Sequence, residues 1–183
     1  LVGEHREKVK SPKFSGTLSD YLKLIEKNSD IPKLAHKRLY EAIADKGVTR
    51  MSKSDSRCNT LFGGEELRTY DYFQTKFFGM ERSLAKIMRF LRSASLKGEE
   101  SRQVLLLLGP VGAGKSALME HIKSALEETE PMYHIDGCPI HEEPLHLIPR
   151  SLRDEFQEIY GVKIEGDLCP VCRYRLKEEF DND

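Results

Sequence analysis

The sequence predicts an α/β fold in which a parallel sheet is flanked by helices and preceded by a small helical segment. The run RQVLLLLG (102–109) is short, continuous and apolar, as is typical of a strand buried on both faces of a parallel sheet. A glycine-rich turn follows at once, and residues 117–126 then carry apolar side chains at helical spacing. Strand, turn and helix therefore occur in the order that a phosphate-binding α/β unit requires.

Two helices are expected in the N-terminal segment of the chain. In TLSDYLKLIEKN (17–28), apolar residues recur on one helical face, and Thr17 and Asp20 have the spacing of a capping box. In IPKLAHKRLYEAIADKG (31–47), the apolar spacing is again helical, and Pro32 suits a first turn. These two stretches form the expected N-terminal helical segment.

A linker is expected between the helical segment and the main domain. Residues 46–59 are rich in Ser, Lys and Arg and show no periodicity, which is typical of an exposed loop. Cys58 within it is expected to be a free thiol. We therefore expect a helical segment at 1–60 and the main domain at 61–183.

Three further elements are expected in the main domain. A helix of about fifteen residues should follow Gly79, because apolar residues recur there at i, i+3, i+4 and i+7. PMYHIDG (131–137) reads as a strand, and PRSLRDEFQEIYG (149–161) as a helix that ends at Gly161. The residues of that helix expected to face inward are Leu152, Phe156 and Ile159.

Composition excludes some classes of function. The 183 residues carry a formal net charge of -1, so no overall positive field favours nucleic acid or an anionic membrane. No apolar run reaches the length of about eighteen residues that a membrane span needs. Four cysteines are too few to suggest a disulfide scaffold. We expect a cytoplasmic protein without nucleic-acid or membrane partners.

The stretch GPVGAGKS (109–116) matches the phosphate-loop pattern G-x-x-x-x-G-K-[ST] at every position. Backbone N–H groups of such a turn, with the helix that starts there, form a concave anion site. Lys115 is expected to meet the outer phosphates, and the Ser116 hydroxyl to bind Mg²⁺. The residues expected to hold the nucleotide phosphates are Gly109, Pro110, Val111, Gly112, Ala113, Gly114, Lys115 and Ser116.

A matching catalytic acid is hard to find. Phosphate-loop hydrolases also hold Mg²⁺ with an acidic residue at the end of a second strand. MYHID, ending at Asp136, is the nearest candidate, but an Asp before Gly137 more often starts a turn. The sequence therefore predicts nucleotide binding and leaves the catalytic residues unknown.

The phosphate loop, the segment YDYFQTKFFGMERSLAKIMRFLRSAS (70–95) and MYHIDGCPIHEEPLHLIP (132–149) together resemble the bacterial PrkA family. Its members are described as serine protein kinases built on an AAA-type ATPase domain, and the likeness covers nearly the whole chain. It implies an AAA-type fold, ATP with Mg²⁺, an unidentified protein substrate, and AAA-type packing between copies. Family members are several times longer, so we expect an N-terminal fragment whose second acidic motif lies elsewhere.

The resemblance also implies an adenine contact. In AAA-type proteins a hydrophobic-Gly segment before the first core helix meets the base, and here that segment maps onto Phe77, Phe78 and Gly79. An apolar slot with close backbone approach suits a base. The alternative is that the two phenylalanines are plain core residues.

Two functional interpretations stay open. One is the ATP- and Mg²⁺-binding region of a PrkA-type serine protein kinase. The other is a nucleotide-gated AAA module without kinase activity, coupled to remodelling or proteolysis, or one whose helices at 17–46 bind a partner.

Four residues have the spacing of a zinc site. GCPIH supplies Cys138 and His141, LCPVC supplies Cys169 and Cys172, and 27 residues separate the two pairs. Two such turns can close a tetrahedral Cys3His structural zinc site spanning 138–172. The alternative is a set of small buried cysteines without metal.

The neighbouring stretch HEEPLH (141–146) is not expected to bind metal as a helical motif. Its histidines are five residues apart and Pro144 interrupts any helix, so both rings could not face one ion.

Overall fold

The computed structural model describes residues 14–51 and 67–180, and the chain forms two compact units. Unit 1 combines Leu1–Pro32 with Glu130–Asp183, and unit 2 is Lys33–Thr129. The domain boundary predicted near residue 60 and the linker residue Cys58 lie outside the described residues.

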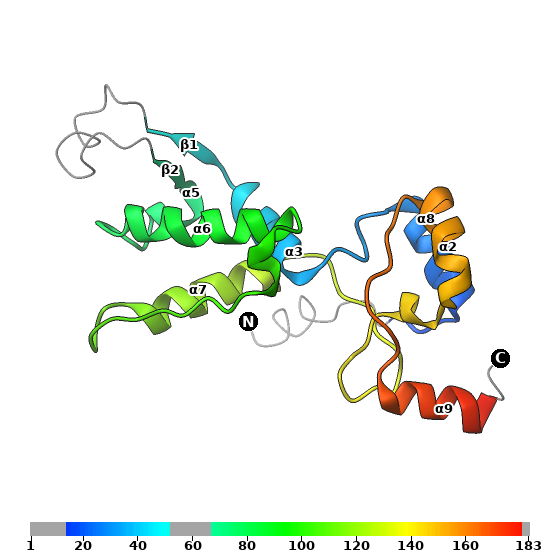
Figure 1. The fold of residues 1–183 in the computed structure, drawn as a ribbon. Coiled ribbons are helices and arrows are strands. Elements are labelled where there is room, and N and C mark those ends of the chain that lie inside the picture. Colours follow the sequence, from blue (N-terminus) through cyan, green and yellow to red (C-terminus); the bar gives the residue numbers. More distant parts are fainter. Residues whose placement is uncertain (1–13, 52–66, 181–183) are drawn as a thin grey trace, which may run out of the picture. The chain divides into compact units, whose positions relative to one another are not determined.

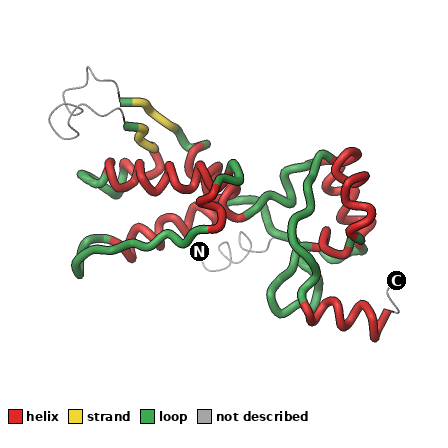
Figure 2. The backbone as a smooth tube through the Cα atoms, viewed as in Figure 1, coloured by secondary structure: helices red, strands yellow, loops and turns green. Residues whose placement is uncertain are grey.

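Unit 2 consists of helices and one small hairpin (Figures 1 and 2). The two strands pair antiparallel, with Thr49 opposite Thr69. The three longer helices confirm the predicted positions, although the first begins at Ala35 rather than in the turn after Pro32. The elements are α3 (Ala35–Ala44), β1 (Val48–Arg50), β2 (Arg68–Tyr70), α5 (Asp71–Gln74), α6 (Glu81–Ser95), the 3-10 turn Glu99–Arg102 and α7 (Lys115–Glu127).

The core of unit 2 lies where α3 packs against α6 and α7. Phe73 of α5, Ile43 of α3 and Met88 of α6 are fully buried there. The periodicity predicted for α6 is confirmed, because its apolar face points into this core. The buried members of the cluster are Ile43, Tyr70, Phe73, Phe77, Leu84, Ile87, Met88, Leu91, Leu118, Ile122 and Ala125.

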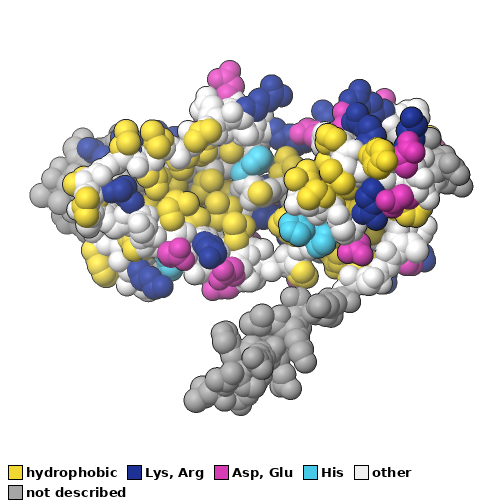
Figure 3. Space-filling view, turned by 90° about the horizontal axis from the view of Figure 1, so that it is seen from below, with side chains coloured by type: hydrophobic (Ala, Val, Ile, Leu, Met, Phe, Trp, Pro, Cys, Tyr) yellow, Lys and Arg dark blue, Asp and Glu magenta, His cyan; other side chains and the backbone are white. Residues whose placement is uncertain are grey.

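The strand predicted at 102–109 is not formed. Its residues are irregular, and Val104 and Leu108 are 90% and 84% exposed, while only Leu107 packs against the core. A strand buried on both faces needs strands on either side for its N–H and C=O groups. Among the described residues the only strands are β1 and β2, which pair with each other. Hydrophobic side chains therefore gather on the surface of unit 2 (Figure 3), and the described part of the chain forms no parallel sheet.

Unit 1 is built around α2, which carries the predicted capping box. Tyr21 and Ile25 of α2 pack against Leu145, Ile148 and Phe156. The elements of unit 1 are α2 (Leu18–Lys27), the 3-10 turns Pro144–Leu147 and Arg150–Leu152, α8 (Arg153–Tyr160) and α9 (Pro170–Phe180).

Two expectations for unit 1 are wrong. The strand predicted at 131–137 is irregular, because Ile135 forms one backbone bond to Glu142 before the chain turns. Of the residues expected to face inward in α8, only Phe156 is buried, while Leu152 and Ile159 are exposed. The buried side of α8 continues one turn on with Tyr160, whose ring stacks on Phe156 at 4.4 Å.

Removing the α2 cap should destabilise unit 1. The Thr17 hydroxyl accepts the Asp20 N–H, and the Asp20 carboxylate accepts from the Thr17 N–H and hydroxyl. Thr17→Ala should cost about 1 kcal/mol in urea unfolding. Ser19→Ala, an exposed first-turn change, is the control and should cost much less.

The same cap should depend on pH. Hydrogen bonds from Thr17 and the nearby Lys23 lower the Asp20 pKa below its ordinary 3.8. The stabilisation is therefore fully present above the ordinary pKa and is lost as the pH falls through the lowered folded-state value. Thr17→Ala should make this loss smaller; an unchanged acid transition in the variant would contradict the assignment.

Candidate functional site

The phosphate loop in unit 2 leads directly into α7. Gly112 and Gly114 have left-handed φ values of 82° and 76°, a conformation that glycine adopts without strain. Apart from chain neighbours, no heavy atom lies within 4 Å of where a Cβ would sit at either glycine. Within the described chain no side chain caps α7, and its first turn carries no acidic residue. Its first N–H groups and positive dipole end are thus open to an anion.

Lys115 is held over this loop. Its Nζ donates to the carbonyl oxygens of Gly109 at 2.7 Å and Pro110 at 2.6 Å. An ammonium has three donors, so one stays available for a phosphate oxygen. Ser116 follows in the exposed first turn of α7. The loop residues predicted from sequence are therefore brought together in the expected order.

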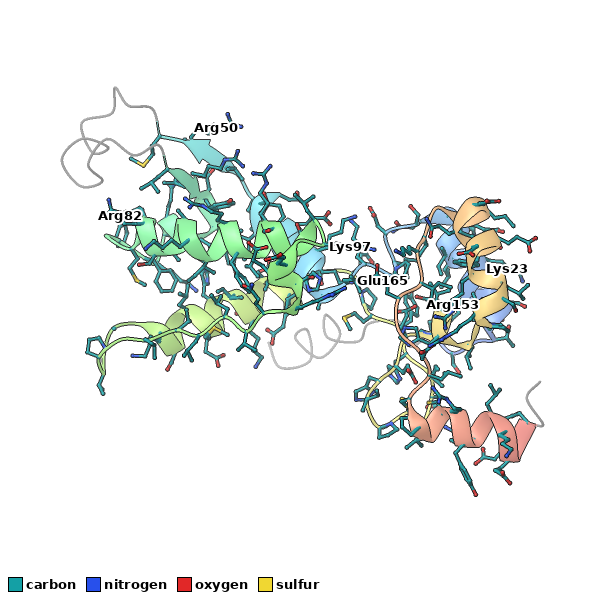
Figure 4. The ribbon with its side chains drawn as sticks, viewed as in Figure 1. Lys23, Arg50, Arg82, Lys97, Arg153 and Glu165 are labelled. Atoms are coloured by element: carbon teal, nitrogen blue, oxygen red, sulfur yellow. The ribbon has the colours of Figure 1, made fainter. Side chains whose placement is uncertain are left out.

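The predicted adenine residues divide between core and surface. Phe77 is buried, and its ring packs against Phe73 at 6.2 Å and His121 at 5.5 Å, so it is a core residue. Phe78 is 79% exposed, and Gly79 has a left-handed φ of 72°. The first turns of α6, where Arg82 is labelled, and of α7 lie at the same end of unit 2 (Figures 1 and 4). The adenine contact of Phe78 and Gly79 stays a prediction.

His121 links α7 to α5, a role that no motif in the sequence indicates. Its ring stacks on Tyr72 at 4.2 Å, and the Tyr72 hydroxyl donates to the His121 carbonyl at 2.7 Å. The His121 Nε2 faces the Tyr72 carbonyl at 3.0 Å, so Nε2 carries the proton. Its Nδ1 then accepts from Lys76 at 3.4 Å. Burial raises the pKa of Tyr72, while nearby Lys46 lowers it in part.

Three cysteines converge in unit 1. Cys138, Cys169 and Cys172 are buried and free, and the Sγ atoms of Cys138 and Cys169 lie 3.9 Å apart. That separation is far longer than the roughly 2.05 Å of a disulfide. The Cys172 N–H donates to the Cys169 sulfur at 3.3 Å, and the Glu142 N–H to the Cys138 sulfur at 3.4 Å.

Glu142, and not His141, completes this cluster. One ligand atom from each cysteine and a Glu142 carboxylate oxygen all lie within 4.8 Å of one another. His141 is exposed, has a left-handed φ of 51°, and packs its ring against His134 at 4.7 Å. Three of the four predicted ligands, the cysteines, therefore lie together. Glu142 occupies the position that the sequence predicted for His141. The sequence signal was a glutamate four residues after Cys138.

Backbone donors shape the ionisation of the cluster. Burial would raise the pKa of Glu142, but the Cys169 N–H and His146 hold that pKa below its ordinary value. Burial likewise opposes ionisation of Cys138, but N–H groups of Glu142 and Ile140 lower its pKa. Burial and the neighbouring thiols raise the pKa of Cys172.

Asp136 lies in a turn, which is the alternative to a Mg²⁺ ligand that the sequence offered for this residue. It is exposed in the turn before Gly137, whose φ is 67°, and its carbonyl accepts from Arg175 at 3.0 Å. It belongs to unit 1, whereas the phosphate loop belongs to unit 2.

Comparison with known proteins identifies related chains. The family model "PrkA AAA domain" matches residues 16–183. The chain is 36% identical over 185 residues to the "ATP-dependent protease PrkA" of Bacillus subtilis strain 168, covering 98% of this chain. It is 30% identical over 174 residues to the "Serine/threonine kinase YeaG" of Escherichia coli K12, covering 91% of this chain. The chain spans 27% of the length of each relative. No solved structure matches.

Proposed function

We propose that this chain, which belongs to the PrkA AAA domain family, binds ATP with Mg²⁺ through the loop at 109–116. Membership of the family makes it an AAA-type phosphate-loop protein with an ATP-binding function. The observation that carries the site assignment is Lys115, whose ammonium is held over a glycine turn at the open N-terminus of α7.

The residues of the loop fit a triphosphate. The N–H groups between Gly112 and Ser116 would hold phosphate oxygens, and Lys115 would neutralise part of their charge. The Ser116 hydroxyl would bind Mg²⁺, which when bound offsets the charge on the outer phosphates. Phe78 and Gly79 would receive the adenine at the first turn of α6.

We further propose that the ATP bound here is the phosphate donor of a serine protein kinase. The name of the Escherichia coli relative supports this activity, and the name of the Bacillus relative favours the alternative of an ATP-dependent, protease-coupled machine. Both need groups beyond the phosphate loop. AAA-type packing between copies and a cytoplasmic location belong to the same proposal. Among the described residues, no helix combines the length and apolarity needed to cross a bilayer.

Labelled ATP separates the two activities. The protein containing this chain is incubated with ATP labelled at the γ-phosphate, with and without a protein substrate. Label on serine or threonine that is lost in Lys115→Ala supports the kinase. Release of inorganic phosphate alone, stimulated by an unfolded protein, supports the alternative.

The adenine contact predicts a selective loss in the variant Phe78→Ala. Stacking of a base on an aromatic ring contributes about 1–3 kcal/mol, so ATP binding should weaken by roughly tenfold or more. Binding of inorganic tripolyphosphate, which has no base, should not change. Calorimetric titration with both ligands makes the comparison.

Phe180→Ala is the matched control, because it removes another exposed phenylalanine, from α9 of unit 1. It should leave both affinities unchanged. If Phe78→Ala lowers the affinities for ATP and tripolyphosphate equally, or changes neither affinity, Phe78 is not the adenine contact.

A further inference from the structure

We propose that unit 1 holds a structural zinc ion bound by Cys138, Cys169, Cys172 and Glu142. Its residues belong to unit 1, whereas the nucleotide loop belongs to unit 2. It retains three of the ligands expected from the sequence and assigns the fourth position to a carboxylate oxygen instead of an imidazole.

The spacing of the sulfur atoms suits a single tetrahedral ion. Zinc–sulfur bonds of about 2.3 Å at tetrahedral angles place two sulfurs about 3.8 Å apart. The Cys138 and Cys169 sulfurs lie 3.9 Å apart, and all four ligand atoms lie within 4.8 Å of one another. One ion at their centre would be within reach of all four groups.

The local backbone already carries the hydrogen bonds that thiolate ligands need. N–H groups of Cys172 and Glu142 donate to the sulfurs of Cys169 and Cys138 at 3.3 and 3.4 Å. Such bonds offset the negative charge of sulfur in a buried place. Ile135 and Leu168 cover the cluster with apolar surface, which keeps water away.

Glu142 is oriented toward the cluster from two sides. Its oxygens accept the Cys169 N–H at 2.8 and 2.9 Å, and Oε1 lies 3.1 Å from the His146 Nδ1. The His146 Nε2 in turn faces the Glu165 carbonyl at 2.8 Å, which fixes the ring. A carboxylate that is almost fully buried needs positive charge close by. A zinc ion would supply the charge directly.

The ligand chemistry selects zinc. Three thiolates favour soft or borderline metals, whereas an oxygen ligand does not suit copper(I). Four protein ligands with no open position are typical of a structural site, not a catalytic one. Three thiolates and one carboxylate also leave the same net charge as a four-cysteine zinc site. The ion would fasten the start of α9 to the turn at 138–142.

Zinc content and X-ray absorption of the wild-type chain test the site. The chain purified without added metal should contain one zinc ion. Its absorption spectrum should show three sulfur neighbours and one oxygen, without the outer-shell scattering of imidazole. A metal-free chain that binds added Zn²⁺ no more tightly than Cys169→Ser would overturn the proposal. If Cys169→Ser does not fold, the zinc content of the wild type decides alone.

Two neighbouring variants test the fourth ligand. Glu142→Gln keeps the shape and an acceptor for the Cys169 N–H, yet should weaken zinc binding at least about 10–100-fold in chelator competition. His141→Ala, one residue away, should change it less than about twofold, because His141 is exposed and turned toward His134. If His141→Ala loses zinc and Glu142→Gln retains it, the fourth ligand is His141 and the assignment of Glu142 is wrong.

Discussion

Replacing Lys115 with alanine should weaken ATP binding by about 100-fold. Hydrogen bonds to charged groups contribute about 1.5–3 kcal/mol each, and about 1.4 kcal/mol is tenfold in affinity. The alanine would leave the outer phosphates facing a loop without its ammonium, which the carbonyl oxygens of Gly109 and Pro110 hold in place. Calorimetric titration of the chain with ATP and Mg²⁺ measures the loss.

Lys123→Ala is the matched control for this change. Lys123 lies two turns further along the same helix, is exposed, and pairs with Glu127 at 3.9 Å on the surface. Its removal takes away the same charge and should change ATP affinity by less than about twofold, since surface pairs contribute little. Equal affinity of Lys115→Ala and the wild type would contradict the phosphate site.

Truncating Phe73 to alanine should destabilise unit 2 by about 3–5 kcal/mol. The ring is 1% exposed and packs edge-on against Tyr72 and Phe77, at 5.4 and 6.2 Å. It also lies 6.0 Å from the His121 ring, which anchors α7. The cavity left behind would loosen the helix that carries the phosphate loop. Urea unfolding followed by tyrosine fluorescence gives the free energy.

The control is Phe78→Ala, which removes the same ring five residues later from an exposed position. It should change the unfolding free energy by less than about 0.5 kcal/mol. The comparison then assigns Phe73 to the stability of unit 2 and leaves Phe78 as a ligand contact. Similar destabilisation by both variants would mean that Phe78 is also a core residue.

Local patterns in the sequence predicted most of the helices and the position of the glycine-rich loop. Thr17 with Asp20 marked the start of α2, the apolar spacing marked α6, and the glycine–lysine pattern marked the loop before α7. Each of these features depends on residues close together in the chain. Local physics therefore predicted these helices and the glycine turn before α7 correctly.

Features that depend on contacts between residues far apart in the sequence were harder to predict. The run at 102–109 has the composition of a central strand, but a strand forms only beside partners, and none of the described residues pairs with it. In α8 the spacing predicted that Leu152, Phe156 and Ile159 face inward, whereas packing buries Phe156 together with part of Tyr160 and leaves the other two exposed.

The fourth member of the cysteine cluster shows the same limit. Spacing alone paired Cys138 with His141, because two residues between ligands is a common turn. His141 has a left-handed backbone and its ring packs against His134, whereas Glu142, one residue later, accepts the N–H of Cys169. That contact joins residues 27 positions apart, which no local pattern records.

Amide chemical shifts during an ATP titration test the central claim most directly. The ¹⁵N-labelled chain is titrated with ATP and Mg²⁺, and a parallel titration uses Lys115→Ala. Saturable shifts should centre on Gly112, Gly114, Lys115 and Ser116, with weaker ones at Phe78 and Gly79, and should vanish in the variant at the same ATP concentration. Saturable shifts centred elsewhere in the chain, or none in the wild type, would contradict ATP binding at this loop.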